Sequence, residues 1–186
     1  MPRRGSTLAV PAFAAVVLAA LAGCGADTVE GPPPSAPEQL RLTSPAFASG
    51  GTIPARFTCE GANVSPPLRW RGAPPGTRGF ALLMEDPDAP GGTFVHWTLY
   101  EMSRQTAGVD AGRVPAGALQ GESSFGDSRY GGPCPPGGDE PHRYAFVVYA
   151  LRSDLGLPAG ASAADVRAAI ARKAIARGRL TARFGR

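Results

Sequence analysis

Short apolar runs separated by glycine- and proline-rich turns fill most of the chain after residue 39. Some of these runs alternate between apolar and polar side chains, and others are rich in aromatic and β-branched residues; both patterns predict strands. The runs lie at residues 40–43, 53–58, 68–70, 80–84, 94–100 and 144–151. The run at 80–84 has no alternation, which indicates a strand buried on both faces. The pattern as a whole predicts a mainly β domain, either a β-sandwich or a Greek-key sheet.

One helix is predicted near the C-terminus. Ser162 and Asp165 match a capping box, in which a hydroxyl and an acidic side chain three residues later bond the first free amides of a helix. Apolar residues then recur at helical spacing, at Val166, Ala169, Ile170 and Ala174. Gly178 is a plausible stop for this helix, and the alternating residues 180–184 predict a last strand.

The first 23 residues have the pattern of a secretory signal peptide. Arg3 and Arg4 precede an apolar run from Leu8 to Leu21, and small residues follow. The run is short for a membrane-spanning helix. Leu21-Ala22-Gly23-Cys24 resembles the bacterial lipobox, in which cleavage leaves Cys24 as a lipid-modified N-terminus. We therefore expect an exported protein that is lipid-anchored to a bacterial membrane; an ordinary cleaved leader is the alternative.

Residues 24–39 contain a Pro-Pro-Pro triplet and no periodic apolar pattern, so they predict a flexible tether ahead of one domain at 40–186. The chain has 19 basic and 15 acidic side chains, and loss of the two leader arginines lowers its formal charge from +4 to +2. So mild a charge argues against a nucleic-acid partner. The basic residues between 167 and 179 are interpreted as a solvated helix face, with contact to anionic lipid as the alternative.

Two cysteines, Cys59 and Cys134, remain once Cys24 is set aside. Export places them in an oxidising compartment, where a single pairing is available. A disulfide is the favoured interpretation, and two separate buried thiols are the alternative. Two scattered cysteines lack the clustered spacing that zinc requires, so no metal site is expected.

Three titratable side chains lie at or near the ends of predicted strands. Asp86 follows the run at 80–84, His96 lies inside the next strand, and His142 opens the strand after a Gly/Pro loop. Taken singly, each has an ordinary structural explanation, such as a hydrogen-bonded core histidine or an Asx turn. Burial of a carboxylate and two imidazoles is costly unless they meet partners, so we expect all three to converge on one polar pocket at a sheet edge.

The same residues resemble the phosphatidylethanolamine-binding protein family, and in particular its bacterial Raf-kinase-inhibitor-like branch. The matching motifs are Asp86-Pro87-Asp88-Ala89-Pro90, His96-Trp97, Tyr130-Gly131-Gly132-Pro133-Cys134-Pro135-Pro136 and His142-Arg143-Tyr144. The resemblance implies a large antiparallel sheet packed on a smaller one, in a Greek-key-like β-sandwich with a C-terminal helix. It also implies a small pocket that holds phosphate, acetate or a phosphoethanolamine headgroup.

Carried over position by position, the resemblance assigns the pocket's polar lining to Asp86, His96, His142 and Tyr144. It places Tyr130 and the backbone around Cys134 and Pro135 at the rim, and it makes Phe94 an aromatic wall. Both imidazoles can donate to an anion, as neutral tautomers or as cations. Asp86 either orients a histidine or receives the ammonium group of a zwitterion.

The expected function is that of a non-catalytic envelope lipoprotein that binds a small anion or a phospholipid headgroup and needs no cofactor. A hydrolase is a weaker alternative, because the chain has no Gly-x-Ser-x-Gly, His-Glu-x-x-His or phosphate-loop motif. An inhibitor of a kinase or peptidase is the second alternative, which the resemblance suggests. Such an inhibitor would act through surface loops such as 110–121 rather than through the pocket histidines.

Overall fold

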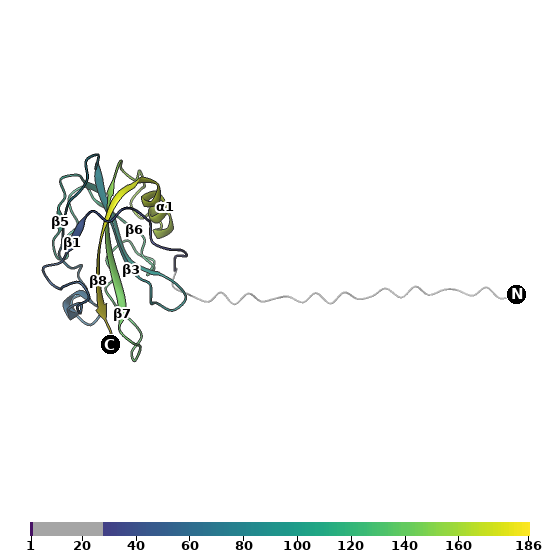
Figure 1. Ribbon diagram of the computed structural model, residues 1–186. Coiled ribbons are helices and arrows are strands. Elements are labelled where there is room, and N and C mark those ends of the chain that lie inside the picture. The colour runs from purple at the N-terminus through teal and green to yellow at the C-terminus, as the bar shows by residue number, and fades with distance from the viewer. Residues whose placement is uncertain (2–27) are drawn as a thin grey trace.

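The computed structural model describes Met1 and residues 28–186, so the predicted signal peptide at 1–23 and the predicted lipidation site, Cys24, lie outside the described residues. Within this part of the chain, two antiparallel sheets pack face to face (Figure 1). The smaller sheet has the order β1-β2-β5, formed by Arg41–Thr43, Leu68–Arg71 and Gly108–Val109. The larger has the order β6-β4-β3-β7-β8, formed by Leu119–Gly121, Phe94–Ser103, Gly79–Asp86, His142–Leu151 and Ala174–Phe184.

The central strand β3 is buried along its whole length, as its continuous apolar run predicted. Phe80, Leu82 and Met84 face the smaller sheet and belong to the main core. The alternate residues Ala81 and Leu83 face the opposite side, where they join a second core beneath the helix α1 (Ala163–Lys173). In Figure 1, α1 covers the face of the large sheet that lies away from β1 and β5. Both faces of β3 are therefore apolar because each supports a separate layer.

The predicted helix forms, but it ends at Lys173 rather than at Gly178. The hydroxyl of Ser162 accepts from the backbone N–H of Asp165 at 3.1 Å, which confirms the expected cap. Ala174 is already extended and begins β8, which pairs with β7 along its whole length. Gly178 is a glycine for another reason. The segment that contains Leu40 runs close to β8 at this point, and a β-carbon on residue 178 would lie 2.4 Å from the carbonyl oxygen of Leu40.

The predicted strand at 53–58 is wrong. Ile53 donates to the carbonyl of Arg183 at 2.8 Å, so the segment begins beside β8. Pro54 follows, and because it has no N–H it cannot continue a ladder. The chain turns instead into a short 3₁₀ helix, η1 (Ala55–Phe57), where Phe57 donates to the carbonyl of Pro54 at 2.9 Å.

Residues 28–39, the described part of the predicted tether, lie against the domain. The guanidinium of Arg167 donates to the carbonyls of Gly31 and Pro32, both at 2.8 Å. The hydroxyl of Tyr149 donates to the carbonyl of Pro34 at 3.2 Å. Prolines have a carbonyl but no N–H, so this segment offers acceptors that buried donors can use.

Arg167 also corrects the expectation of a solvated basic face, because it is buried in α1 and forms an ion pair with Glu85 of β3. Burial raises the pKa of the Glu85 carboxyl, and the neighbouring Arg167 guanidinium opposes that rise. The other arginines of the run lie nearer the surface. No helix in the described part of the chain is long and apolar enough to span a bilayer.

The disulfide expected between Cys59 and Cys134 is present, with 5.4 Å between the two α-carbons. It joins the segment after η1 to the Gly/Pro loop that precedes β7. Backbone contacts support the same junction: Cys59 donates to the carbonyl of Pro133 at 3.1 Å, and Gly132 donates to the side chain of Asn63 at 2.8 Å. The loop is therefore held by both covalent and polar links.

Candidate ligand pocket

A cavity of about 230 Å³ opens at one end of the large sheet, where β3 ends and β4 and β7 begin. Asp86 is the last residue of β3, His96 is near the start of β4, and His142 is the first residue of β7. Because β3 is antiparallel to both neighbours, its C-terminal end lies beside their N-terminal ends. The residues around the cavity are Asp86, Ala89, Pro90, Phe94, His96, Phe125, Cys134, Pro135, Pro136, His142 and Tyr144.

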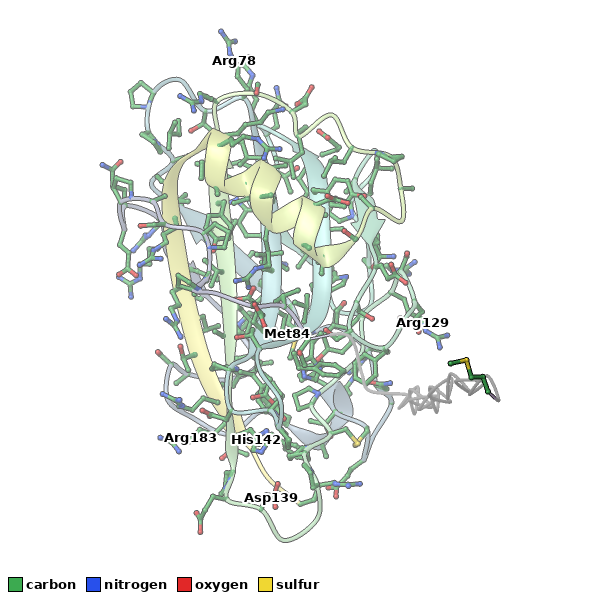
Figure 2. All side chains as sticks on the ribbon, turned by 90° about the vertical axis from the view of Figure 1, so that its right-hand side faces the viewer. Arg78, Met84, Arg129, Asp139, His142 and Arg183 are labelled. Carbon is green, nitrogen blue, oxygen red and sulfur yellow. A yellow bond between two sulfur atoms is a disulfide. The ribbon has the colours of Figure 1, made fainter. Side chains whose placement is uncertain are left out.

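Asp86 and His142 form a buried pair at the base of this cavity. The Nδ1 atom of His142 lies 2.7 Å from Oδ2 of Asp86. An ionised carboxylate only accepts hydrogen bonds, so Nδ1 carries the proton. The second carboxylate oxygen of Asp86 accepts from the backbone N–H of Asp88 at 2.9 Å. Asp86 thus fixes the tautomer of His142 and leaves Nε2 as the atom that can meet a ligand. His142 lies at the end of the molecule that also carries Asp139 (Figure 2).

His96 is held as a neutral imidazole with a defined tautomer. Its Nδ1 atom lies 2.8 Å from the carbonyl oxygen of Gly131, which can only accept, so Nδ1 carries the proton. Burial lowers the pKa of His96 to about 4. Near neutral pH, Nε2 of His96 is therefore a hydrogen-bond acceptor. Neutral His96 is not the anion donor that the sequence suggested, because its single N–H, at Nδ1, already donates to the Gly131 carbonyl.

Aromatic rings form the remaining wall. The ring of Tyr144 lies edge-on to His96 at 5.2 Å between centroids, and the ring of Phe94 packs against His96 at 4.9 Å. Burial and the nearby Asp86 carboxylate raise the pKa of the Tyr144 hydroxyl, so it stays protonated. Phe125 packs edge-on against Phe94 at 4.7 Å and is 49 % exposed at the mouth. Phe125 was not predicted as a lining residue, because it is an isolated apolar residue in a polar stretch of sequence.

The expected rim residues are only partly brought to the cavity. Cys134 and Pro135 line it, but Tyr130 does not. The hydroxyl of Tyr130 donates to the carbonyl of Phe57 at 2.6 Å, and its ring packs edge-on against Trp97. Tyr130 therefore links the Gly/Pro loop to η1 and is not a rim residue.

The loop after β3 is held to the start of β7 by an ion pair. The carboxylate of Asp88 accepts from the backbone N–H of Arg143 at 2.8 Å and from its guanidinium. These hydrogen bonds and the charge of Arg143 lower the pKa of Asp88 to about 2. The pair fixes the loop that supplies Ala89 and Pro90 to the cavity.

Among the residues that the structure describes, no group of three or more His, Cys, Asp or Glu side chains could hold a metal ion. The sulfur of Cys134 is bonded to Cys59. The two serines that precede Phe125 in the sequence have hydrogen-bond partners inside the protein: Ser123 donates to Asp127 at 3.2 Å, and Ser124 accepts from the backbone N–H of Val95 at 2.9 Å.

Comparison with known proteins identifies the family of this chain. The sequence profile described as phosphatidylethanolamine-binding protein matches residues 43–185. The chain belongs to the phosphatidylethanolamine-binding protein family. Its relatives in this family include a UPF0098 protein of Aquifex aeolicus, 47 % identical over 132 residues, which cover 68 % of this chain and 77 % of the relative.

LppC of Mycobacterium tuberculosis, which is named as a lipoprotein, is 40 % identical over 193 aligned positions, covering 95 % of this chain and 94 % of LppC. Among solved structures, Escherichia coli YbcL, titled a new member of the mammalian family, matches with a TM-score of 0.76 at 33 % identity, over 80 % of this chain and 99 % of YbcL. A carboxypeptidase Y inhibitor matches at 18 % identity with a TM-score of 0.51, over 78 % of this chain and 83 % of the inhibitor, and shows the shared fold alone.

The depressed pKa of His96 predicts a loss of stability in mild acid. The imidazole has an ordinary pKa of 6.5 in the unfolded chain and about 4 in the folded protein. Between these values the unfolded state binds a proton that the folded state does not, so the free energy of unfolding falls as the pH is lowered, by about 1 kcal/mol per pH unit.

Urea unfolding at pH 6.5 and at pH 4.5 measures this slope. His96→Asn is the matched variant, because an amide can still donate to the Gly131 carbonyl but does not titrate. We expect a flatter pH dependence in the variant. An equal slope in both proteins would show that other groups cause the acid sensitivity.

Proposed function

We propose that the protein is a non-catalytic envelope lipoprotein whose pocket binds a small phosphate compound that also carries an ammonium group, as in the phosphoethanolamine headgroup. The observation that carries this proposal is the Asp86–His142 pair next to His96 in one small cavity. The resemblance to the family suggested such a ligand, and the hydrogen-bonding groups of the pocket narrow it.

The pocket offers acceptors as well as donors. Nε2 of neutral His96 and the carboxylate of Asp86 accept hydrogen bonds, and the hydroxyl of Tyr144 can donate one. An imidazolium donates from both ring nitrogens, so His142, whose Nδ1 is already bonded to Asp86, donates to a ligand from Nε2 in its cationic form. A fully ionised phosphate alone would face the Asp86 carboxylate and the lone pair of His96, which is unfavourable. An ammonium group supplies donors to those acceptors, and the phosphate accepts from His142 and Tyr144. A zwitterion therefore satisfies both sets of groups.

The lipoprotein part of the proposal is supported by the likeness to LppC, which extends over 95 % of this chain. A relative that matches only the folded domain would carry no information on the N-terminus. Together with Leu21-Ala22-Gly23-Cys24, this supports Cys24 as the lipidated residue and a bacterial membrane as the location.

A binding role without catalysis is supported by the chemistry of the lining. Cys134 is bonded to Cys59 and is not a free nucleophile. His142 donates its Nδ1 proton to Asp86, as in a catalytic dyad, but none of the residues that line the cavity is a serine or a threonine that this imidazole could activate.

Calorimetric titration of the mature protein in detergent tests the proposal. We expect phosphoethanolamine to bind more tightly than either inorganic phosphate or ethanolamine, because each of these satisfies only part of the pocket. His142→Ala and Asp86→Asn should each weaken phosphoethanolamine binding by about tenfold or more, the effect of losing one charged hydrogen bond.

Asp110→Asn is the control, because Asp110 pairs with Arg69 at the exposed end of the smaller sheet, and its side chain is 72 % exposed. The proposal is wrong if no titrant binds, or if His142→Ala, shown to be folded by circular dichroism, binds as the parent does. Stronger binding of phosphate than of phosphoethanolamine would show that the ammonium group is not recognised.

A further inference from the structure

We propose that the segment that links the domain to its lipid anchor holds the pocket mouth against the membrane, so that the pocket takes headgroups of lipids in the bilayer rather than free compounds. This inference rests on the proposed function for the anchor and the ligand. It adds the orientation of the domain and the source of the ligand, and both follow from contacts of residues 28–39.

Residues 28–39, which we call the anchor segment, form hydrogen bonds with the loop between β3 and β4, which forms one side of the mouth. The hydroxyl of Thr28 donates to the carbonyl of Gly91 at 3.2 Å, and the backbone N–H of Val29 donates to the carbonyl of Thr93 at 3.0 Å. Gly91 follows Pro90 and Thr93 precedes Phe94, and both of these neighbours line the cavity. The N-terminal end of the anchor segment is therefore held at the mouth of the pocket.

The rest of the segment is fixed as well. Arg167 bonds two of its carbonyls and is itself paired with buried Glu85. Farther along, Glu38 pairs with Arg177 at the edge of β8, and Arg177 donates to the carbonyl of Pro37 at 2.8 Å. The segment thus follows the domain from the edge of β8, past α1, to the mouth of the pocket.

Chain geometry then limits how far the anchor can lie from the pocket. Cys24 precedes Thr28 by four residues, and four extended residues span at most about 14 Å. If residues 24–39 were instead a free tether, Cys24 would lie on average roughly 20 Å from residue 39 in any direction, and the domain would have no fixed orientation relative to the membrane. Because Thr28 is bonded at the mouth, the lipid chains enter the bilayer beside the pocket.

The surface around the mouth suits a membrane interface. Phe125 is one of the few large apolar side chains exposed in the described part of the chain, at 49 %, and it lies at this mouth. Pro90 and Pro136 are exposed beside it. Proteins that bind at the membrane surface bury Trp, Phe and Leu side chains at the boundary between headgroups and acyl chains, so Phe125 can rest there. The cavity behind it, of about 230 Å³, is large enough for a headgroup but not for acyl chains.

Fluorescence quenching by the bilayer tests the orientation. The full lipidated protein is reconstituted in vesicles of phosphatidylethanolamine and phosphatidylglycerol that contain a nitroxide-labelled lipid. Phe125→Trp places a probe at the mouth, and Pro136→Trp places a second one at another exposed residue of the mouth in case the first variant does not fold. Arg78→Trp is the control, because Arg78 lies at the other end of the molecule from His142 (Figure 2). The native tryptophans, Trp70 and Trp97, are buried and supply a constant background.

We expect the labelled lipid to quench the probes at positions 125 and 136 but not the probe at 78. Equal quenching at all three positions, or stronger quenching at 78, would overturn the proposed orientation, and the ligand would then come from solution. Calorimetry with soluble phosphoethanolamine, without vesicles, tests the binding function separately. If soluble phosphoethanolamine does not bind but the probes at 125 and 136 are quenched, the proposed ligand is wrong. If phosphoethanolamine binds but those probes are not quenched, the proposed orientation is wrong.

Insertion of about 20 glycine and serine residues between Asp27 and Thr28 tests the role of the short link, because it adds roughly 25 Å of flexible reach and changes no described residue. We expect the Phe125→Trp probe to lose its quenching, while the affinity for soluble phosphoethanolamine is unchanged. Quenching that survives the insertion would show that the link does not set the orientation.

Discussion

Replacement of Arg167 with methionine should lower the free energy of unfolding by about 3–5 kcal/mol, because it leaves the carboxylate of Glu85 buried without its partner. Arg167 and Glu85 are 7 % and 3 % exposed, so water cannot readily replace the lost contact. The carbonyls of Gly31 and Pro32 lose their donor at the same time. For a domain of this size, the midpoint of thermal unfolding should fall by about 6–20 °C.

Two controls separate the ion pair from the general effect of losing an arginine. Arg172→Met makes the same chemical change at an exposed position of α1 and should alter stability by less than about 0.5 kcal/mol. The double variant Arg167→Met/Glu85→Met removes both charges and should recover much of the loss. If Arg167→Met unfolds at the same urea concentration as Arg172→Met, the pair does not stabilise the fold as the contacts indicate.

Removal of the disulfide should lower the free energy of unfolding by about 4 kcal/mol. The bond joins Cys59 and Cys134 across a sequence separation of 75, and a cross-link of that length strongly restricts the unfolded chain. Urea unfolding of the Cys59→Ala/Cys134→Ala variant under non-reducing conditions measures the loss. The folded state should keep the junction, because Tyr130 and Gly132 still bond the segment near η1.

Reduction provides the matched control for this variant. With dithiothreitol, the parent protein should unfold at the same urea concentration as the double alanine variant, which itself should not respond to the reductant. A single alanine variant would leave a free thiol and is not equivalent. If the double variant is as stable as the oxidised parent, the backbone contacts alone hold the loop, and the bond has little effect on stability.

Strand periodicity predicted the central part of the fold because burial dictates side-chain type there. The apolar run at 80–84 needed two covered faces, and the structure supplies the smaller sheet on one side and α1 on the other. One error, the missed Pro54, was local, and the other occurred where a distant segment decides the local conformation. Gly178 resembled a helix stop, but a side chain is absent there because the backbone of Leu40 packs directly against it. Leu40 is distant in sequence, so no local pattern reveals this contact.

The polar residues of the pocket were predictable for the same kind of reason. A carboxylate and two imidazoles at strand ends require partners, and antiparallel strands bring those ends together. The aromatic residues were harder, because their role depends on the path of a loop. Tyr130 lies in the Gly/Pro motif, yet its side chain turns toward Phe57, whereas Phe125 comes from a stretch with no motif and reaches the mouth.

The contacts that fix residues 37–53 against β8 also close the outer edge of the large sheet. Outward backbone groups of Arg177, Thr181 and Arg183 all bond to these crossing segments. An unpaired strand of this length would be a template for strand addition by another chain. With its edge already occupied, β8 gives a second copy of the chain little to pair with, so strand addition at this edge is disfavoured even where copies are crowded.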